Sequence, residues 1–278
     1  GAGPSGTAAI DTICGNIWAG ERASHSGLSV ATTNSSASAT VTACEKINQS
    51  RRMRMLTVRT MTATRTEIET YLATLLAVER FKDYGPNGLQ VEGRDAVRRL
   101  VSGVTASLAL IDAAIAQGAD AILVHHGLFW RGQDGRLTGW LAQRVRQLMA
   151  HGISLFAYHL PLDAHEPWGN NAQFGARLGL VADLRFGEQE LGFAGPALQQ
   201  HSLAALAQHV QSALAREPLV LPGDGRALKR IGWCTGGAQG YFEAAIAAGV
   251  DAFITGEVSE PQAHLARDMP GAHVAEIA

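Results

Sequence analysis

The stretch "RLVSGVTASLALIDAAIAQGADAILVHH", residues 99–126, decides the fold. It opens with a short apolar run, continues with apolar residues at helical spacing as far as Gly118, and ends with the apolar run AILV. A strand, a helix and a second strand in this order form a βαβ unit, whose strands lie parallel in a buried sheet. The stretch therefore predicts an α/β fold.

A second stretch, "RIGWCTGGAQGYFEAAIAAGVDAFITGE" (residues 230–257), aligns with the first without a gap. Gly118 falls on Gly249, and Asp120 falls on Asp251. These two matches are the main evidence that the stretches are related, because alanines in the two helical parts can match by chance. Strands and helices also alternate between the two stretches. We therefore predict two similar βαβ lobes with mostly parallel sheets and a metal site at the carboxyl ends of the strands.

Residues 1–60 differ from the rest of the chain, because they are small and polar with no sustained period of two or 3.6. We expect a disordered or non-native extension here, with the α/β domain over residues 61–278. A rival interpretation takes the basic, acid-free stretch at 51–65 as an organelle transit segment. Just beyond it, Thr66 and Glu69 match a capping box at the start of a helix.

The composition narrows the class of protein. Hydrophobic residues make up 46% and charged residues 17% of the 278, as in ordinary globular α/β proteins. The net charge of -2 argues against nucleic-acid binding. The three cysteines form no C-x-x-C pair and no disulfide framework, which favours a reduced, cytoplasmic setting. We expect no membrane span, since no apolar run reaches about 18 residues.

His125 and His126 stand where the buried run AILV ends. Ligands of open α/β sheets bind beyond the carboxyl ends of strands, and neutral imidazole is a common ligand for zinc, iron and similar metals. With Gly127 freeing the backbone, both rings can face one cleft, and each can serve a different ion of a metal pair. Alternatively, they are surface-loop histidines, or one of them bonds a backbone carbonyl.

The motif "YHLPLDAHEPWGNN" (158–171) follows the next predicted strand and contains His159 and Asp163. Pro161 predicts a shaped loop rather than a continuous helix. An aspartate can bridge two cations with its two oxygens, and its charge offsets theirs. Alternatively, Asp163 caps the helix near Asn170 or turns the loop.

Glu257 follows the buried run AFIT. It fits a general base, a partner that orients a histidine, or a carboxylate at a helix N-terminus. His264 fits a structural role better than a ligand role. Cys234 lies inside an apolar strand and is interpreted as an inert core thiol.

Together these motifs give the chain a resemblance that spans roughly residues 66–278. It resembles the Nif-three-like dinuclear-metal-centre family, also known as GTP cyclohydrolase 1 type 2 homologues. The matching blocks are "DYGPNGLQVEG", "VSGVTAS", "ILVHHGLFW", "HLPLDAHEPWGNNAQ" and "DAFITGEVSE". The resemblance implies a two-lobed α/β protomer in a toroidal homohexamer, with a two-metal site facing the interior. By motif match, His125, His126 and Asp163 fall on metal-binding positions, and His159 falls on a further site position that can also bind metal.

The chain departs from the family at its end. The family carries a late H-H-x-x-E motif that completes the metal pair, whereas this sequence ends at "GAHVAEIA", residues 271–278. We interpret the domain as incomplete at its C-terminus and expect weakened metal affinity. His273 and Glu276 come too early for that motif and are not assigned as ligands.

The resemblance implies a metal-dependent hydrolase with two divalent ions, whose identity stays open among zinc, iron, manganese and nickel. A metal-activated water would attack a small-molecule substrate of nucleotide or phosphoester type, with Glu257 or His159 as the catalytic proton relay. The alternative is a non-catalytic hexameric metal-binding or regulatory scaffold that contacts protein partners.

Overall fold

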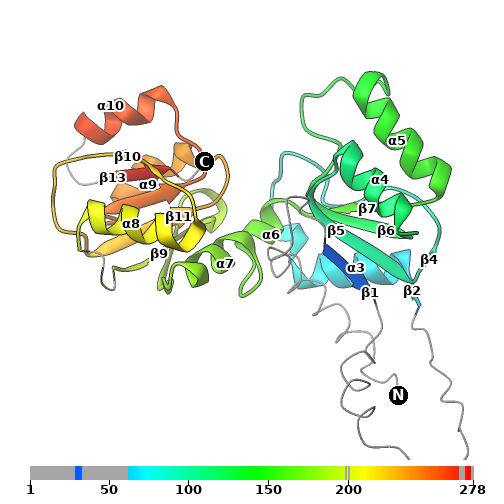
Figure 1. The fold of residues 1–278 in the computed structure, drawn as a ribbon, viewed down its shortest axis with the longest axis horizontal. Helices are drawn as coiled ribbons and strands as arrows, with labels where there is room; N and C mark the ends of the chain where they lie inside the picture. Colours follow the sequence, from blue (N-terminus) through cyan, green and yellow to red (C-terminus); the bar gives the residue numbers. More distant parts are fainter. Residues whose placement is uncertain (1–28, 33–61, 198, 200, 269–272, 277–278) are drawn as a thin grey trace, which may run out of the picture. The chain divides into compact units, whose positions relative to one another are not determined.

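The structure is a computed structural model that describes residues 29–32, 62–197, 199, 201–268 and 273–276. The chain divides into two compact units, the first ending at His159 and the second beginning at Leu160. Each unit has its own sheet and its own helices (Figure 1). Among the described helices, none is long and apolar enough to cross a membrane.

The sheet of the first unit has the strand order β1-β5-β6-β7-β3. Its three central strands β5, β6 and β7 run parallel, and the edge strands β1 and β3 pair antiparallel to them. The strands are β1 (Ser29–Thr32), β3 (Gly88–Val91), β5 (Arg99–Thr105), β6 (Ala121–His126) and β7 (Ser154–Ala157), with a separate pair β2 (Ala63–Thr64) and β4 (Ala96–Val97). The helices are α3 (Arg65–Leu75), α4 (Leu108–Ala116) and α5 (Gly139–His151), with a 3-10 turn at Val78–Arg80.

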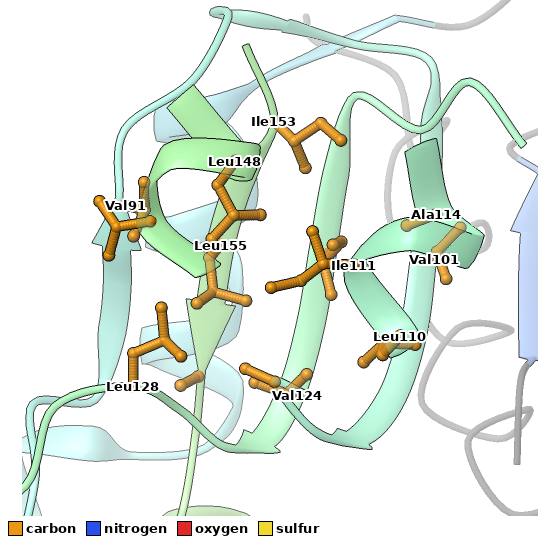
Figure 2. Packing of buried hydrophobic residues seen from close by; sticks show 14 of the residues in the cluster. Val91, Val101, Leu110, Ile111, Ala114, Val124, Leu128, Leu148, Ile153 and Leu155 are labelled. Carbon is orange, nitrogen blue, oxygen red and sulfur yellow. The ribbon is translucent and has the colours of Figure 1, made fainter. Parts of the chain in front are cut away.

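The unit β5–α4–β6 forms because its helix has a clear start, a clear stop and one apolar face. The Ser107 side chain caps the start by accepting a hydrogen bond from the backbone N–H of Leu110. Gly118 ends the helical stretch with a positive φ of 66°. Leu110 and Ile111 are buried and pack against the sheet residue Val101 and its neighbours (Figure 2). This core fixes the positions at which β5 and β6 end.

The sheet of the second unit has the order β10-β13-β12-β11-β9-β8. Again three strands, β11, β12 and β13, run parallel, and the others pair antiparallel at the edges. The strands are β8 (Leu184–Phe186), β9 (Gly192–Pro196), β10 (Leu219–Leu221), β11 (Arg230–Cys234), β12 (Ala252–Thr255) and β13 (His273–Glu276). The helices are α6 (Leu160–Ala164), α7 (Asn170–Arg177), α8 (Leu203–Leu214), α9 (Phe242–Ala247) and α10 (Glu260–Asp268), with 3-10 turns at Glu188–Glu190 and Gln239–Tyr241.

The predicted α/β class and the two βαβ units are confirmed, and the residues that echo in sequence have the same structural role. The Asp120 carboxylate accepts two hydrogen bonds, at 2.9 and 3.0 Å, from backbone N–H groups at the start of β5. Asp251 accepts two at 2.9 Å from the equivalent groups at the start of β11. Gly118 and Gly249 both have a positive φ after the crossover helix. The antiparallel edge strands were not predicted.

The predicted capping box at the start of the first helix was wrong. The capping box is formed by Thr64 and Glu67, one T-x-x-E pattern earlier than expected, and α3 begins at Arg65. The predicted partner Glu69 instead accepts a hydrogen bond from the backbone of Leu89 at 3.0 Å. The stretch "TRTEIE" (64–69) contains two overlapping T-x-x-E patterns, and the N-terminal one starts the helix.

Pro161 does not exclude a helix. It lies at the second residue of the short helix α6, within the first turn, where a missing N–H group costs no helical hydrogen bond. Of the expected extension, the structure describes only the backbone of β1, which pairs with β5. The expectation for the other residues of 1–60 lies outside the described residues.

Candidate metal centre

His125 and His126 are the last two residues of β6, so the strand continues through them rather than ending before them. His126 pairs with Thr105 at the end of β5. The two rings are half-buried, and their centroids lie 4.5 Å apart. Both imidazoles are therefore held at the carboxyl end of a central parallel strand.

His159 joins them from the neighbouring strand. It lies two residues after the end of β7, which is parallel to β6. Its ring centroid lies 4.8 Å from that of His125 and 5.7 Å from that of His126. One nitrogen from each of the three rings lies within 4.8 Å of the others. The first unit thus brings three predicted site residues together at the carboxyl ends of two neighbouring strands.

The environment of His125 favours the neutral ring that a metal needs. Its Nδ1 lies 3.1 Å from the carbonyl oxygen of Tyr158, which can only accept, so Nδ1 carries the hydrogen. Burial, with a smaller contribution from nearby His159, lowers the pKa of His125 to about 4. At neutral pH the ring is neutral, and its lone pair is at Nε2.

In His159 and His126, too, Nδ1 is the nitrogen that contacts a hydrogen-bond partner. In His159 it lies 2.7 Å from a carboxylate oxygen of Asp83, whose side chain is only 3% exposed. In His126 it lies 3.2 Å from the hydroxyl of Thr105, which can donate or accept, so that contact does not fix the ring's hydrogen.

This donor set fits a divalent metal. Histidine ligands commonly donate one ring N–H to a carboxylate or a backbone carbonyl, as His159 and His125 do here, and bind metal through the other nitrogen. Three imidazoles suit zinc, iron or nickel. The cluster of His125, His126 and His159 can therefore hold a metal ion.

Asp163, the predicted carboxylate ligand, belongs to the second unit. It lies in α6, is half-buried, and accepts a hydrogen bond from the Asn170 side chain at 2.6 Å. Asn170 is the first residue of α7, so this bond places the Asp163 carboxylate at the start of that helix, and the alternative role of Asp163 there stays open. That Asp163 shares metals with the histidines stays a prediction.

Glu257, the other predicted catalytic residue, also belongs to the second unit. It is exposed and follows the end of β12 by two residues. One of its carboxylate oxygens lies 3.2 Å from where a Cβ at Gly237 would stand. Its catalytic role stays a prediction.

The remaining candidates lie outside the histidine cluster. His264 contacts Glu260 at 2.6 Å on the exposed side of α10. His273 and Glu276 contribute backbone to β13, and their side chains are outside the described residues. The interpretation of Cys234 is confirmed: the thiol is buried, and burial raises its pKa to about 12.

The sequence assigned no supporting role to the segment "DYGPNGLQVEG", residues 83–93, which leads into β3 beside the cluster. In that segment Gln90 accepts a hydrogen bond from the backbone of Leu128 at 2.7 Å and donates one to Pro86 at 2.9 Å. Gly127 is needed for this contact, since a Cβ there would overlap the Gln90 side chain. Its φ is not positive, so space rather than backbone freedom requires the glycine.

Two aromatic rings flank the cluster. Trp130 meets the His159 ring edge-on, with centroids 5.0 Å apart, and lies 6.0 Å from His126. The Tyr84 ring, 56% exposed, lies 6.3 Å from His159. Side chains able to stack on a planar group therefore stand beside the candidate ligands.

Comparison with known proteins identifies similar chains. The family model described as Duf34/NIF3 (NGG1p interacting factor 3) matches residues 63–277. A protein of Neisseria meningitidis serogroup B named GTP cyclohydrolase 1 type 2 homolog is 51% identical over 188 residues, covering 68% of this chain and 76% of that protein. The protein of the same name from Escherichia coli K12 is 44% identical over 211 residues, covering 73% and 82%.

Solved structures are also similar. A structure titled protein ybgI, of unknown function, has a TM-score of 0.72 at 42% identity and covers 76% of this chain and 85% of that one. TTHA1606 from Thermus thermophilus has a TM-score of 0.66 at 33% identity, covering 77% and 85%. A Bacillus cereus protein related to NIF3, 14% identical with a TM-score of 0.67, covers 78% and 88% and shares the fold.

Proposed function

The chain belongs to the Duf34/NIF3 family, and from this premise we propose that it is a metal-dependent hydrolase with a dinuclear centre. Its substrate class is a nucleotide or another phosphoester-type small molecule. The name of the similar proteins, GTP cyclohydrolase 1 type 2 homolog, supports a nucleotide. A second candidate, the non-catalytic hexameric scaffold, is separated from this proposal by the experiment below.

One observation carries the proposal. Three histidine rings from two adjacent parallel strands meet with ligand nitrogens within 4.8 Å of one another. Neutral imidazole is a common ligand of divalent metals, and the low pKa of His125 keeps that ring neutral at neutral pH. A divalent cation can be held by the nitrogens of three such rings at once.

We assign His125, His126 and Asp163 as the residues that hold the two ions, and His159 as a further ligand. His159 was first predicted as a proton relay, and its distance to the other rings favours the ligand role. The bound ions supply positive charge that lowers the pKa of water and polarises the bond under attack. Zinc, iron, manganese and nickel all suit these ligands.

The other residues bind substrate and move protons. Trp130 and Tyr84 offer ring faces and edges beside the cluster, on which a nucleobase can stack. Glu257 is the proposed general base, because an exposed carboxylate beyond a strand end can exchange protons with water. We propose a homohexamer as the assembly and the cytoplasm as its location.

The test uses the purified full chain loaded in turn with Zn²⁺, Mn²⁺, Fe²⁺ and Ni²⁺. Metal content is measured by elemental analysis, and turnover is measured with GTP and with bis-p-nitrophenyl phosphate. We expect hydrolysis of at least one substrate. In Asp163→Asn we expect it to fall by about 100-fold or more, because loss of a ligand should cost at least as much as the roughly 10–100-fold cost of losing a residue that orients a ligand.

The matched control is Asp112→Asn, which changes an exposed aspartate of α4 and leaves turnover unchanged. Light scattering of each variant reports whether the assembly persists. A metal-filled, intact assembly that turns over neither substrate contradicts the hydrolase and favours the scaffold.

A further inference from the structure

A buried carboxylate lies behind the histidine cluster. The Asp83 side chain is 3% exposed and belongs to the loop that precedes β3. One of its oxygens, Oδ1, accepts hydrogen bonds from Nδ1 of His159 at 2.7 Å and from the backbone N–H of Tyr84 at 2.6 Å. The other, Oδ2, accepts from the Asn87 side chain at 2.9 Å. A buried carboxylate needs such donors to offset its lost hydration.

Asn87 closes these contacts into a ring of three hydrogen bonds. Its Nδ2 donates to Asp83, and its Oδ1 accepts from the backbone N–H of His159 at 2.8 Å. A backbone N–H can only donate, so the orientation of the Asn87 amide is fixed. A carboxylate oxygen can only accept, so Nδ1 of His159 is the donor to Asp83.

The loop that carries the ring is held from outside as well. The Arg131 guanidinium donates to the backbone carbonyl of Asp83 at 2.7 Å, and the Arg131 N–H donates to the carbonyl of Tyr84 at 2.6 Å. These bonds connect the loop to the segment that follows β6 and its two histidines. The carboxylate is therefore positioned before any ligand arrives.

We infer that Asp83, held by Asn87, is a positioning residue that fixes His159 as the Nδ1–H tautomer and leaves Nε2 as the metal-binding atom. The metal-binding part of this inference rests on the proposed function, whereas the tautomer does not. His125 has the same arrangement through a backbone carbonyl. The two rings thus present the same nitrogen by two independent means.

Exchanging the residues at positions 83 and 87 should preserve the ring of hydrogen bonds, whereas changing one of them should break it. In Asp83→Asn alone, the new amide keeps its oxygen on His159 and Tyr84 and turns its NH₂ toward the NH₂ of Asn87, so two donors meet. In the double variant Asp83→Asn/Asn87→Asp, the second change supplies an acceptor, and the ring closes again with one bond reversed. Asp83→Ala removes the acceptor for His159 altogether.

The experiment measures tautomers and metal affinity separately. Metal-free protein labelled with ¹⁵N-histidine is studied by long-range ¹H–¹⁵N correlation at alkaline pH, and Co²⁺ affinity is measured by visible absorption. In the wild type we expect His159 as Nδ1–H. In Asp83→Ala we expect a shift toward Nε2–H and about 10–100-fold weaker Co²⁺ binding.

The double variant is expected to restore the Nδ1–H tautomer and to bind Co²⁺ more tightly than Asp83→Ala. The His125 signals are expected to stay unchanged in all of these variants. The control variant Asp112→Ala is expected to keep the wild-type tautomers and Co²⁺ affinity. The inference is overturned by a wild-type His159 in the Nε2–H form, by an unchanged tautomer in Asp83→Ala, or by a double variant as impaired as Asp83→Ala. If Asp83→Ala does not fold, the tautomer of His159 in the wild type and in the double variant still tests the inference. A wild type with the expected tautomer that binds no Co²⁺ contradicts the proposed function and leaves the tautomer result in support of Asp83.

Discussion

At the scale of single residues, the candidate centre depends on which nitrogen of each imidazole carries hydrogen. Nδ1 of His125 points at a carbonyl and Nδ1 of His159 at a carboxylate, so in both rings the opposite nitrogen keeps its lone pair. Without those two acceptors, neutral rings would interconvert between tautomers. The hydrogen bonds behind the cluster therefore determine what it can bind.

The lowered pKa of His125 predicts how the stability of the metal-free protein varies with pH. The residue titrates near 6.5 in an unfolded chain and at about 4 in the folded one. Between these values the unfolded chain binds a proton that the folded chain does not, so the free energy of unfolding decreases as the pH falls. We expect His125 to account for a loss of roughly 3 kcal/mol from pH 6.5 to 4.

Urea unfolding in EDTA across this pH range measures the effect. The variant His125→Gln should lack this part of the pH dependence, and His151→Gln, which changes an exposed histidine, should keep it. Equal slopes in His125→Gln and the wild type would show that the ring is not held neutral.

Gly127 supports a prediction about packing beside the cluster. A Cβ at this position would overlap the Gln90 side chain, so Gly127→Ala must displace it and break its hydrogen bond to Leu128. We expect a loss of about 1–3 kcal/mol in the free energy of unfolding. Gly135→Ala is the matched control, because no atom lies within 4 Å of a Cβ there.

A double-mutant cycle with Gln90→Ala tests the cause. Once the glutamine side chain is removed, Gly127→Ala should cost little more than Gln90→Ala alone. Additive losses in the double variant would place the strain elsewhere.

At the scale of elements, the crossover units β5–α4–β6 and β11–α9–β12 share the same anchor. Asp120 and Asp251 each accept two backbone hydrogen bonds from the start of the preceding strand, so the carboxylate connects the beginning of both parallel strands. This explains why an aspartate recurs in the sequence at the same place in both units.

We expect Asp120→Ala to lower the free energy of unfolding by roughly 1–3 kcal/mol, because two part-buried backbone N–H groups lose their acceptor. Asp251→Ala should act in the same direction. Chemical denaturation of both variants is compared with Asp112→Ala, an exposed position of α4 where a change within about 0.5 kcal/mol is expected. An Asp120→Ala variant as stable as this control would contradict the shared anchor.

The sequence predicted the elements whose local signals agree. In β6 the apolar run AILV follows the glycine that ends α4, and both signals agree on a strand, which continues through His125 and His126. The neighbouring parallel strand β7 brings His159 to the same end of the sheet. The short edge strands, such as β8 with three residues, carry too few residues to show a period.

The supporting loop could not be predicted for a different reason. Asp83 and Asn87 act on His159, which lies more than seventy residues later in the chain. No spacing or periodicity links residues so far apart, and a turn-rich segment gives the same local pattern whether or not its side chains have a partner. Only the packing of the loop against the sheet reveals their role.

At the scale of the whole molecule, one βαβ scaffold occurs twice and differs at the strand ends. His125 and His126 end β6, whereas the equivalent positions after β12 are Gly256 and Glu257. The shared elements specify the fold, and the residues beyond the strands specify the chemistry. The proposed centre combines three imidazoles with the carboxylate of Asp163.

The most direct test is a crystal structure of the Zn²⁺-loaded protein with anomalous diffraction data at the zinc edge. The account predicts anomalous peaks about 2.0–2.2 Å from ring nitrogens of His125 and His126 and from a carboxylate oxygen of Asp163. Zinc bound elsewhere, with these three side chains in separate environments, would contradict it.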